Sequence, residues 1–197
     1  MKKTLLSLCV IIAALVVATL SGCSTNTQGD SASPVFLAGD FELLPLQKCV
    51  NDNTTLQFST TQLRNRLKNP NATSLQFMDV QLDKYTVTWT RIDGGTKASP
   101  SQDFAGNVIV PPNGSSSLTD YPYMSADSLI RPPLDQLFPF NGGIDKETGR
   151  SEIRQAGHVI WFGHTLSGQP VTSPVATFDM IFIFCASAGR IEPKRAQ

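Results

Sequence analysis

Side chains that bind metals or carry charge are scarce in this sequence. Only 2 histidines and 4 cysteines occur in 197 residues, and charged residues make up 16% of the chain. The 16 basic and 16 acidic side chains cancel at neutral pH, so the basic excess that binds phosphate backbones is missing. C-x-x-C pairs and the G-x-S-x-G nucleophile elbow are also missing. These absences argue against a nucleic-acid partner and give no support to a structural zinc site or an α/β-hydrolase.

A long apolar run near the N-terminus is the strongest signal that the sequence does contain. Lys2 and Lys3 precede apolar residues from Leu5 to Leu20, which is the pattern of a secretory signal peptide. The run ends in Leu20-Ser21-Gly22-Cys23, and a polar stretch follows. This ending resembles the lipobox of bacterial lipoproteins, where an aliphatic and two small residues precede a cysteine. An uncleaved membrane anchor and an ordinary secretory leader are the alternatives.

The lipobox resemblance implies that residues 1–22 are removed and that Cys23 becomes the lipidated N-terminus. In such lipoproteins the thiol receives a diacylglyceryl group and the new amino group is acylated, for example with palmitate. Three acyl chains exceed the two signals that stable membrane attachment requires. Ser24 stands where an Asp commonly directs retention in the inner membrane, so the resemblance implies the outer membrane. We expect a lipid-anchored protein of the bacterial cell envelope, whose near-neutral net charge gives by itself no reason to expect its surface to bind anionic lipid.

Two cysteines remain for the folded region, one near each of its ends. The cell envelope is oxidising, so we expect Cys49 and Cys185 to form a disulfide that ties the first strand to the last. The chain-entropy model gives such a crosslink on the order of 4–5 kcal/mol of stability. Two buried free thiols or a metal pair are the alternatives, although neither cysteine has the spacing of a metal ligand.

Alternation of apolar and polar residues predicts an all-β fold. The clearest strand covers residues 77–91, where Tyr85, Val87 and Trp89 share one face and a bulge is expected near Asp83-Lys84. Turn residues separate this strand from other candidates. Those candidates are residues 54–60, 108–110, 115–121, 157–166 and 171–185.

The pattern favours an antiparallel immunoglobulin-like β-sandwich of about seven strands, with Trp89 as its candidate buried core tryptophan. One short helical segment is expected within residues 125–138, where Asp127 can cap it and Pro132-Pro133 limits its length. The strand at 171–185 is apolar on both faces, so a central position is expected for it. The predicted organisation is a signal peptide (1–22), a lipidated cysteine with a flexible tether and irregular lead-in (23–47), the β-sandwich (48–191) and a C-terminal tail (192–197).

Four segments are similar to a group of small bacterial envelope lipoproteins of unassigned function. They are Leu63-Arg64-Asn65-Arg66-Leu67-Lys68-Asn69-Pro70-Asn71, Asp79-Val80-Gln81-Leu82 through Arg91-Ile92-Asp93-Gly94-Gly95-Thr96, Asn141-Gly142-Gly143-Ile144-Asp145-Lys146-Glu147-Thr148-Gly149-Arg150, and Phe162-Gly163-His164-Thr165-Leu166-Ser167-Gly168. The resemblance implies an all-β fold with two cysteines across most of residues 54–185. It implies no catalytic residue.

The polar residues form no convincing catalytic or metal-binding set. His158 and His164 share a strand face but lie about 20 Å apart, too far to ligate one metal, so we interpret each as structural. A Ser–His–Asp site remains open, because its partners need only meet in space. Residues 141–147 supply several oxygens but lack the calcium-loop order, and a turn held by Asp145 with Arg150 is favoured. Tyr121-Pro122-Tyr123 is interpreted as packing on the sandwich rather than as a ligand ledge.

The sequence therefore favours a non-enzymatic accessory or binding module with no catalytic, metal or cofactor site and no nucleic-acid partner. Its expected partners are the membrane, through Cys23, and an unidentified envelope protein. An envelope hydrolase with a site on the loops at one end of the sandwich is the alternative. A third possibility is strand addition along the apolar segment Phe178–Phe184, which requires that strand to be an exposed edge.

Overall fold

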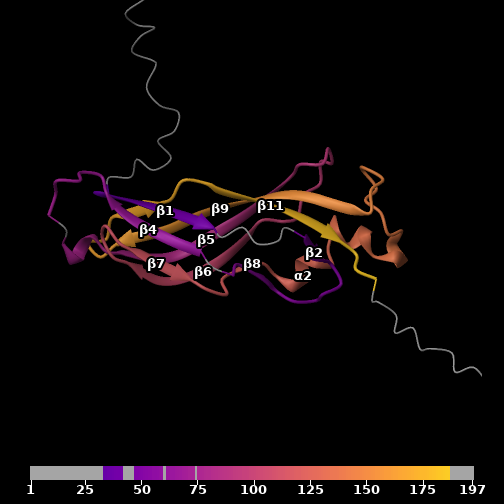
Figure 1. Cartoon of the computed structure of the whole chain (residues 1–197), viewed down its shortest axis with the longest axis horizontal. Coiled ribbons are helices and arrows are strands. Elements are labelled where there is room, and N and C mark those ends of the chain that lie inside the picture. Colours follow the sequence, from indigo (N-terminus) through magenta and orange to yellow (C-terminus); the bar gives the residue numbers. More distant parts are fainter. Residues whose placement is uncertain (1–32, 42–46, 60, 74, 187–197) are drawn as a thin grey trace, which may run out of the picture.

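The computed structural model describes residues 33–41, 47–59, 61–73 and 75–186, and within them the fold is mostly β. A mixed six-stranded sheet has the order β2-β11-β9-β5-β6, and β10 also pairs with β9 (Figure 1). Its strands are β2 (Gln47–Cys49), β5 (Val80–Arg91), β6 (Gln102–Val110), β9 (Glu152–Thr165), β10 (Pro170–Thr172) and β11 (Ala176–Ile183).

Two smaller sheets form the other layer. A three-stranded sheet has the order β1-β4-β7, and β3 pairs with β8. The strands are β1 (Val35–Phe41), β3 (Leu56–Gln57), β4 (Thr61–Leu67), β7 (Ser115–Leu118) and β8 (Pro122–Met124). Backbone hydrogen bonds between Phe58 and residues 120 and 121 bridge the two small sheets.

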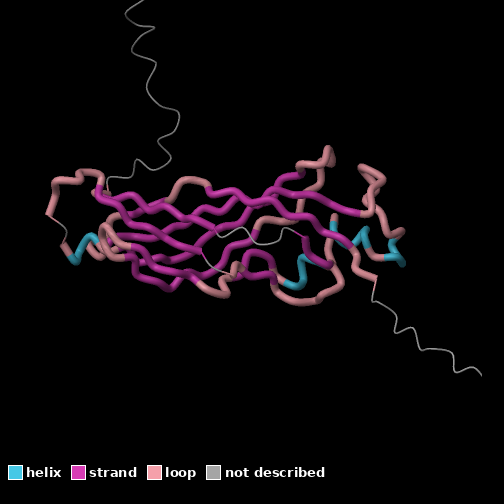
Figure 2. Tube along the Cα trace, in the orientation of Figure 1, coloured by secondary structure: helices cyan, strands magenta, loops and turns pink. Residues whose placement is uncertain are grey.

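Among the residues that the structure describes, helical structure is limited to four short segments, which lie at the two ends of the strands (Figure 2). They are the 3-10 turns η1 (Gln76–Met78), η2 (Leu134–Leu137) and η3 (Pro139–Asn141) and the helix α2 (Ala126–Leu129). The predicted single α-helix is present, but its N-cap is Ser125, and Asp127 lies in its first turn. Asp127 was therefore wrongly identified as the cap.

One hydrophobic core joins the layers. Leu37 and Leu63 of the small sheet and Tyr85 and Trp161 of the large sheet are each at most 1% exposed. The rings of Tyr85 and Trp161 lie 4.4 Å apart between centroids. The predicted burial of Trp89 is confirmed, and the predicted bulge near Asp83 appears as a register shift in both pairings of β5.

Several strand predictions need correction. The expected irregular lead-in at 34–47 contains β1, which pairs with β4 and buries Val35 and Leu37. Strand β4 was missed, although its alternating exposure follows the sequence Thr-Gln-Leu-Arg-Asn-Arg-Leu. Strand β6 is longer than the predicted 108–110. The sheet is not wholly antiparallel, because β2 runs parallel to β11. Periodicity misses β4 because its inward face includes the polar Thr61 and Asn65, and it misses β2 because a strand of three residues is too short to show a period.

Strand β11 lies inside the sheet. It pairs with β9 over its whole length and with β2 at Ile181–Ile183. Phe178, Met180 and Phe182 face the core, as predicted. Strand addition over Phe178–Phe184 is therefore blocked at its C-terminal part by β2.

The molecule is elongated along its strands (Figures 1 and 2). The start of β1, η1 and the β9–β10 hairpin lie at one end, called here the β1 end; Lys68 N donates to Pro34 O there, and Ser167 N donates to Phe77 O. The segments α2, η2 and η3 and the C-terminus of β11 lie at the opposite end. The two ends therefore present different segments to their surroundings.

Candidate functional site

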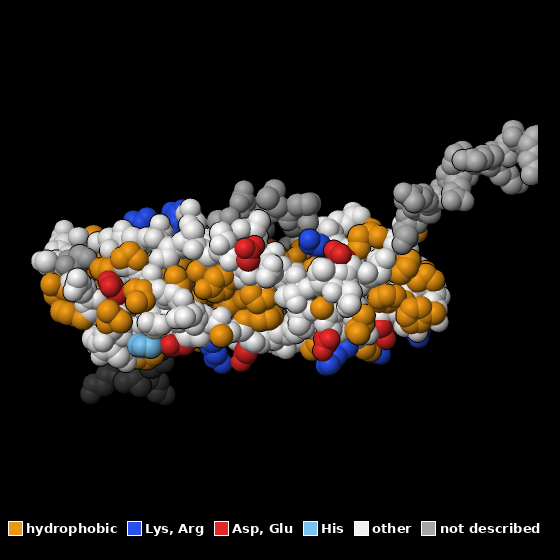
Figure 3. Space-filling view, turned by 90° about the horizontal axis from the view of Figure 1, so that it is seen from below, with side chains coloured by type: hydrophobic (Ala, Val, Ile, Leu, Met, Phe, Trp, Pro, Cys, Tyr) orange, Lys and Arg blue, Asp and Glu red, His pale blue; other side chains and the backbone are white. Residues whose placement is uncertain are grey.

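Three aromatic side chains gather at the end opposite β1; Phe140 is exposed, and Phe138 and Phe184 are partly buried against the core. Phe140 is 80% exposed, and its ring centroid lies 5.3 Å from that of Phe138. The Phe138 ring in turn meets Phe184 edge-on at 5.7 Å. Figure 3 shows hydrophobic side chains at this end of the molecule. We call Phe138, Phe140 and Phe184 the aromatic end. Patches of this kind on a protein surface are typical of interaction sites.

Local chain geometry explains why Phe140 points outward. Pro139 is the first residue of η3. The backbone N–H at this position has no partner within a helix, so a proline, which lacks the N–H, costs no hydrogen bond there. Gly142 then ends η3 with a φ of 116°, a left-handed conformation that a side chain would strain. Gly143 N donates to Phe138 O at 3.0 Å and closes the turn. The Pro-Phe-Asn-Gly-Gly sequence therefore holds Phe140 on a tight turn.

A buried ion network fixes the connection that carries this turn. Arg91, at the end of β5, donates through Nε to Asp93 at 2.8 Å and through Nη2 to Asp145 at 2.6 Å. All three side chains are at most 1% exposed. Arg91 Nη1 lies 3.7 Å from the carboxylate of Glu147. One cation on the sheet thus joins two loops, residues 92–101 and 142–151.

The carboxylates of this network are held ionised. Burial raises the pKa of Asp93, but hydrogen bonds from Arg91 and from the amides of Arg154 and Gly95 outweigh it and bring the pKa to about 2. Burial also raises the pKa of Asp145, but hydrogen bonds from Arg91 and Thr148 outweigh it and lower that pKa. Attraction between the buried cation and its two carboxylate partners offsets the free energy that removing the charge from water costs.

Residues 141–147 form the predicted turn. Asp145 N donates to Arg150 O, and Gly149 N donates to Asp145 O, both at 2.8 Å. The contact between Asp145 and Arg150 is through the backbone, while the Asp145 carboxylate accepts from Arg91 and from Thr148 Oγ1. Within the described part of the chain, no group of three or more His, Cys, Asp or Glu residues could hold a metal ion.

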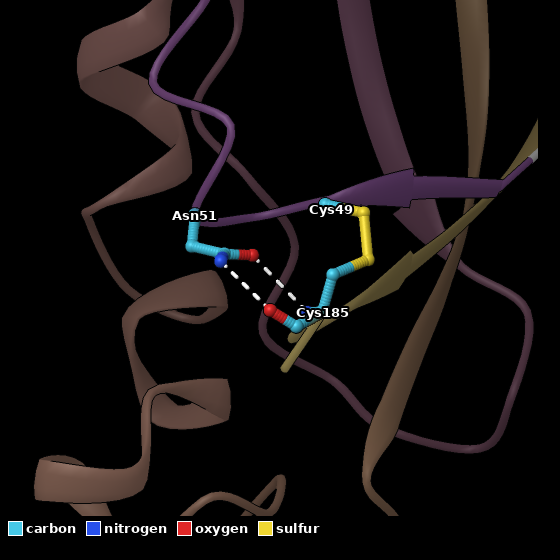
Figure 4. The surroundings of a disulfide bond; sticks show 3 residues. All are labelled: Cys49, Asn51 and Cys185. Atoms are coloured by element: carbon cyan, nitrogen blue, oxygen red, sulfur yellow. Dashed lines mark hydrogen bonds between the residues drawn. A yellow bond between two sulfur atoms is a disulfide. The ribbon is translucent and has the colours of Figure 1, made fainter. Parts of the chain in front are cut away.

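A disulfide closes the same end of the fold. Cys49 and Cys185, 136 residues apart, are bonded with their Cα atoms at 5.3 Å (Figure 4). Asn51 lies beside the bond, where Nδ2 donates to Cys185 O at 2.8 Å and Cys185 N donates to Oδ1 at 3.1 Å. Cys49 is the last residue of β2, the second strand, so the expectation that the disulfide ties the first strand is wrong. Phe184 of the aromatic end directly precedes this fixed residue.

The two histidines lie on the outer face of the large sheet. His158 Nε2 is 2.8 Å from Thr90 Oγ1, and its Nδ1 is 3.2 Å from Thr177 Oγ1. His164 Nδ1 is 2.9 Å from Asp83 Oδ2, with both side chains at least 42% exposed. Among the described residues, no hydroxyl or thiol hydrogen bonds to Nε2 of His164, which a Ser–His–Asp arrangement requires. The geometry supplies a His–Asp pair without a nucleophile.

Much of the segment 121–123, which leads into strand β8, packs against the core as predicted. Tyr123 is 5% exposed, and its ring centroid lies 4.9 Å from that of Phe58. The hydroxyl of Tyr85 donates to Pro122 O at 2.5 Å. These residues therefore fill the sandwich rather than forming an exposed ledge.

Sequence analysis missed both main features of this end. Arg91 was assigned only to the end of a strand, and its distant partner Asp145 carries no local signal of the contact. The Phe138-Pro139-Phe140 segment, followed by two glycines, was the available hint of an exposed aromatic turn. The predicted lipidation site Cys23 and residues 1–22 lie outside the described residues. Within the described chain, no helix has the length and apolarity needed to cross a bilayer.

Comparisons with known proteins leave the chain without a family. No protein-family model matches it, and no curated protein matches it. A search of solved structures matches an X-ray structure titled as a Northeast Structural Genomics Consortium target, with 11% identity and a TM-score of 0.36. That match covers 83% of this chain and 95% of the other. So distant a likeness carries no argument about function.

Proposed function

We propose that the protein is a lipid-anchored, non-enzymatic accessory or binding module of the cell envelope, with an immunoglobulin-like sandwich as its body. The lipobox-like Leu20-Ser21-Gly22-Cys23 supports anchoring, and the Ser24 that follows favours the outer membrane. The Cys49–Cys185 disulfide is typical of extracytoplasmic proteins. The lipobox-like segment and the disulfide point to the envelope independently of each other.

The observation that carries a binding role is the separation of the two ends. The chain leaves the sandwich toward Cys23 at Ser33, at the β1 end, while the exposed Phe140 lies at the opposite end. Residues 24–33 span at most about 35 Å when extended. A module tethered at one end presents its aromatic end away from the tether, where an envelope protein can reach it.

The rigid setting of Phe140 also favours binding. The Arg91–Asp145 ion pair and the disulfide hold the segments on both sides of the aromatic end. A hydrophobic anchor that is already ordered loses little conformational entropy on association. Aromatic residues in such positions commonly dominate the binding energy of an interface.

Site-specific photo-crosslinking in intact cells tests the binding role. A photoreactive phenylalanine replaces Phe140 in one variant and Phe77, 49% exposed at the β1 end, in a matched control. We expect the variant at position 140 to give one discrete protein adduct that the variant at 77 lacks. Identical adduct patterns, or none at 140, would contradict a partner at the aromatic end.

The anchor is tested separately. Cys23→Ala should remove the mass of the acyl groups and shift the protein out of the membrane fraction, because only a thiol can form the thioether. A Cys23→Ala protein of unchanged mass that still fractionates with membranes would refute lipid anchoring. Fractionation of the wild type with inner rather than outer membranes would refute only the outer-membrane assignment.

A further inference from the structure

The structure gathers positive and apolar side chains at the β1 end, although the chain as a whole carries no net charge. Arg64, Arg66 and Lys68 alternate along β4 and its continuation, with Arg64 and Arg66 exposed. Asp40 on β1 pairs with Arg64 at 2.9 Å. Arg66 has no acidic partner among the described residues. The charge balance of the sequence therefore conceals a local basic stripe.

Exposed hydrophobic residues accompany this stripe. Phe36 on β1 is 45% exposed and pairs in register with Arg66, and the Nζ of Lys68 lies 5.2 Å from the Phe36 ring centroid. Leu75, the N-cap of η1, and Phe77, within η1, are 42% and 49% exposed.

Hydrogen bonds hold these segments together at one end of the molecule. Leu166, at the tip of the β9–β10 hairpin, is 50% exposed and donates from its backbone to Asp79 O at 3.0 Å. Asn65 Nδ2 donates to Met78 O at 2.9 Å, which joins β4 to η1. Hydrophobic side chains are visible at this end as well in Figure 3. The surface that these segments form is called here the basal surface, made up of Phe36, Arg66, Lys68, Leu75, Phe77 and Leu166.

We infer that the basal surface contacts an anionic lipid bilayer, with Phe77 and Leu166 entering the interface and Arg66 and Lys68 meeting the headgroups. The inference deepens the proposed function, on which it rests for the position of the anchor. The chain outside the structure leaves at Ser33, beside Lys68, so a lipid on Cys23 keeps this end within about 35 Å of the bilayer.

Bilayer contact explains features that the sandwich itself does not need. No residue of η1 is buried, so the exposed side chain of Phe77 does not contribute to the hydrophobic core. Apolar side chains flanked by Arg and Lys are the residues with which peripheral proteins enter a membrane interface. Positive side chains near an anionic surface add attraction that salt weakens.

A depth probe on the acylated protein tests the orientation. Phe77→Cys and Leu166→Cys provide single thiols for an environment-sensitive fluorophore, because Cys49 and Cys185 are bonded to each other. Phe140→Cys is the matched control at the far end. In vesicles of phosphatidylglycerol and phosphatidylethanolamine that contain nitroxide-labelled lipid, we expect quenching at 77 and 166 and none at 140. An acylated protein without quenching at 77 and 166, or with equal quenching at 140, overturns the inference.

Vesicle binding by the mature-length chain (residues 23–197) that carries Cys23→Ala separates this inference from the anchor, because the apolar leader 1–22 would bind vesicles by itself. We expect salt-sensitive binding to phosphatidylglycerol-containing vesicles and little binding to phosphatidylcholine vesicles. Phe77→Ser should weaken that binding about tenfold, because it removes most of an aromatic side chain that the bilayer would otherwise bury. Arg66→Glu should abolish the preference for anionic lipid.

Neither substitution touches the core, so thermal unfolding should be unchanged and serves as the folding control. Binding that both substitutions leave intact, or no binding at low salt, overturns the basal surface whether or not Cys23 is acylated. Absence of acylation in the wild-type protein overturns the proposed anchor, while the vesicle assay still decides on the basal surface.

Discussion

The Nη2 atom of Arg91 lies 2.6 Å from Oδ2 of Asp145, 54 residues further along the chain, and both side chains are at most 1% exposed. This pair fastens the connection that carries Phe140 to the end of strand β5. Rigidity at the aromatic end therefore depends on one buried cation and its carboxylates.

Arg91→Met should destabilise the protein strongly. The substitution leaves Asp93 and Asp145 buried without their cation, and breaking a buried ion pair in this way costs about 3–5 kcal/mol. The free energy of unfolding in urea measures the loss. Arg154→Met is the control, because Arg154 is 47% exposed and pairs with Glu152 on the surface, where about 0–1 kcal/mol is at stake. Equal effects of the two substitutions would contradict the importance of the buried network.

Acid should weaken the same network. The pKa of Asp93 is about 2 in the folded protein and about 3.9 when the chain is unfolded, so its contribution is fully present above about pH 4. That contribution is lost as the pH falls toward 2, because the unfolded state then binds the proton more readily. Urea unfolding at several pH values measures the slope.

Asp93→Asn should be less stable at neutral pH and lose less stability on acidification. Asp103 provides the control: hydrogen bonds from Thr86 and Lys84 lower its pKa too, but the side chain is 57% exposed. Asp103→Asn should leave the acid slope nearly unchanged. A wild-type slope that Asp93→Asn does not alter would exclude this carboxylate as the source.

Loss of the disulfide should lower stability more than loss of its neighbouring hydrogen bonds. In the chain-entropy model, a crosslink that closes a 136-residue separation contributes about 4–5 kcal/mol. Asn51→Ala, which removes two exposed hydrogen bonds to Cys185, should cost about 0.5–1.5 kcal/mol. Denaturant unfolding of Cys49→Ala/Cys185→Ala and of Asn51→Ala compares the two. A double variant as stable as the wild type would refute the crosslink as a stabilising element.

Gly163→Ala should disturb the centre of the large sheet. A Cβ atom at this position would lie 2.3 Å from the carbonyl oxygen of Gln81, on the neighbouring strand beside the bulge. Backbone cannot move aside as a side chain can, so β5 and β9 must separate locally. We expect a loss of about 1–3 kcal/mol in thermal or urea unfolding. Thr172→Ala, on the neighbouring strand β10, is the control, and a smaller loss for Gly163→Ala than for this control would contradict the close approach.

The alternation of apolar and polar residues was sufficient to predict a strand and its buried face where that strand's own residues alternate clearly. The alternation of Tyr85, Val87 and Trp89 predicted the core face of β5, and the parity change before it predicted the bulge at Asp83. It failed at β4, where two of the inward-facing residues, Thr61 and Asn65, are polar although both are buried, so the apolar alternation is interrupted.

The sequence by itself determined the β-rich composition of the fold, the burial of Trp89 and the two cysteines that pair. Those properties follow from side-chain period and residue type, which are local. Only the tertiary structure decided that β2 runs parallel to β11, that Arg91 meets Asp145, and that basic and apolar residues share the β1 end. Each of these depends on which distant segments become neighbours, and that choice is made by packing around a common core.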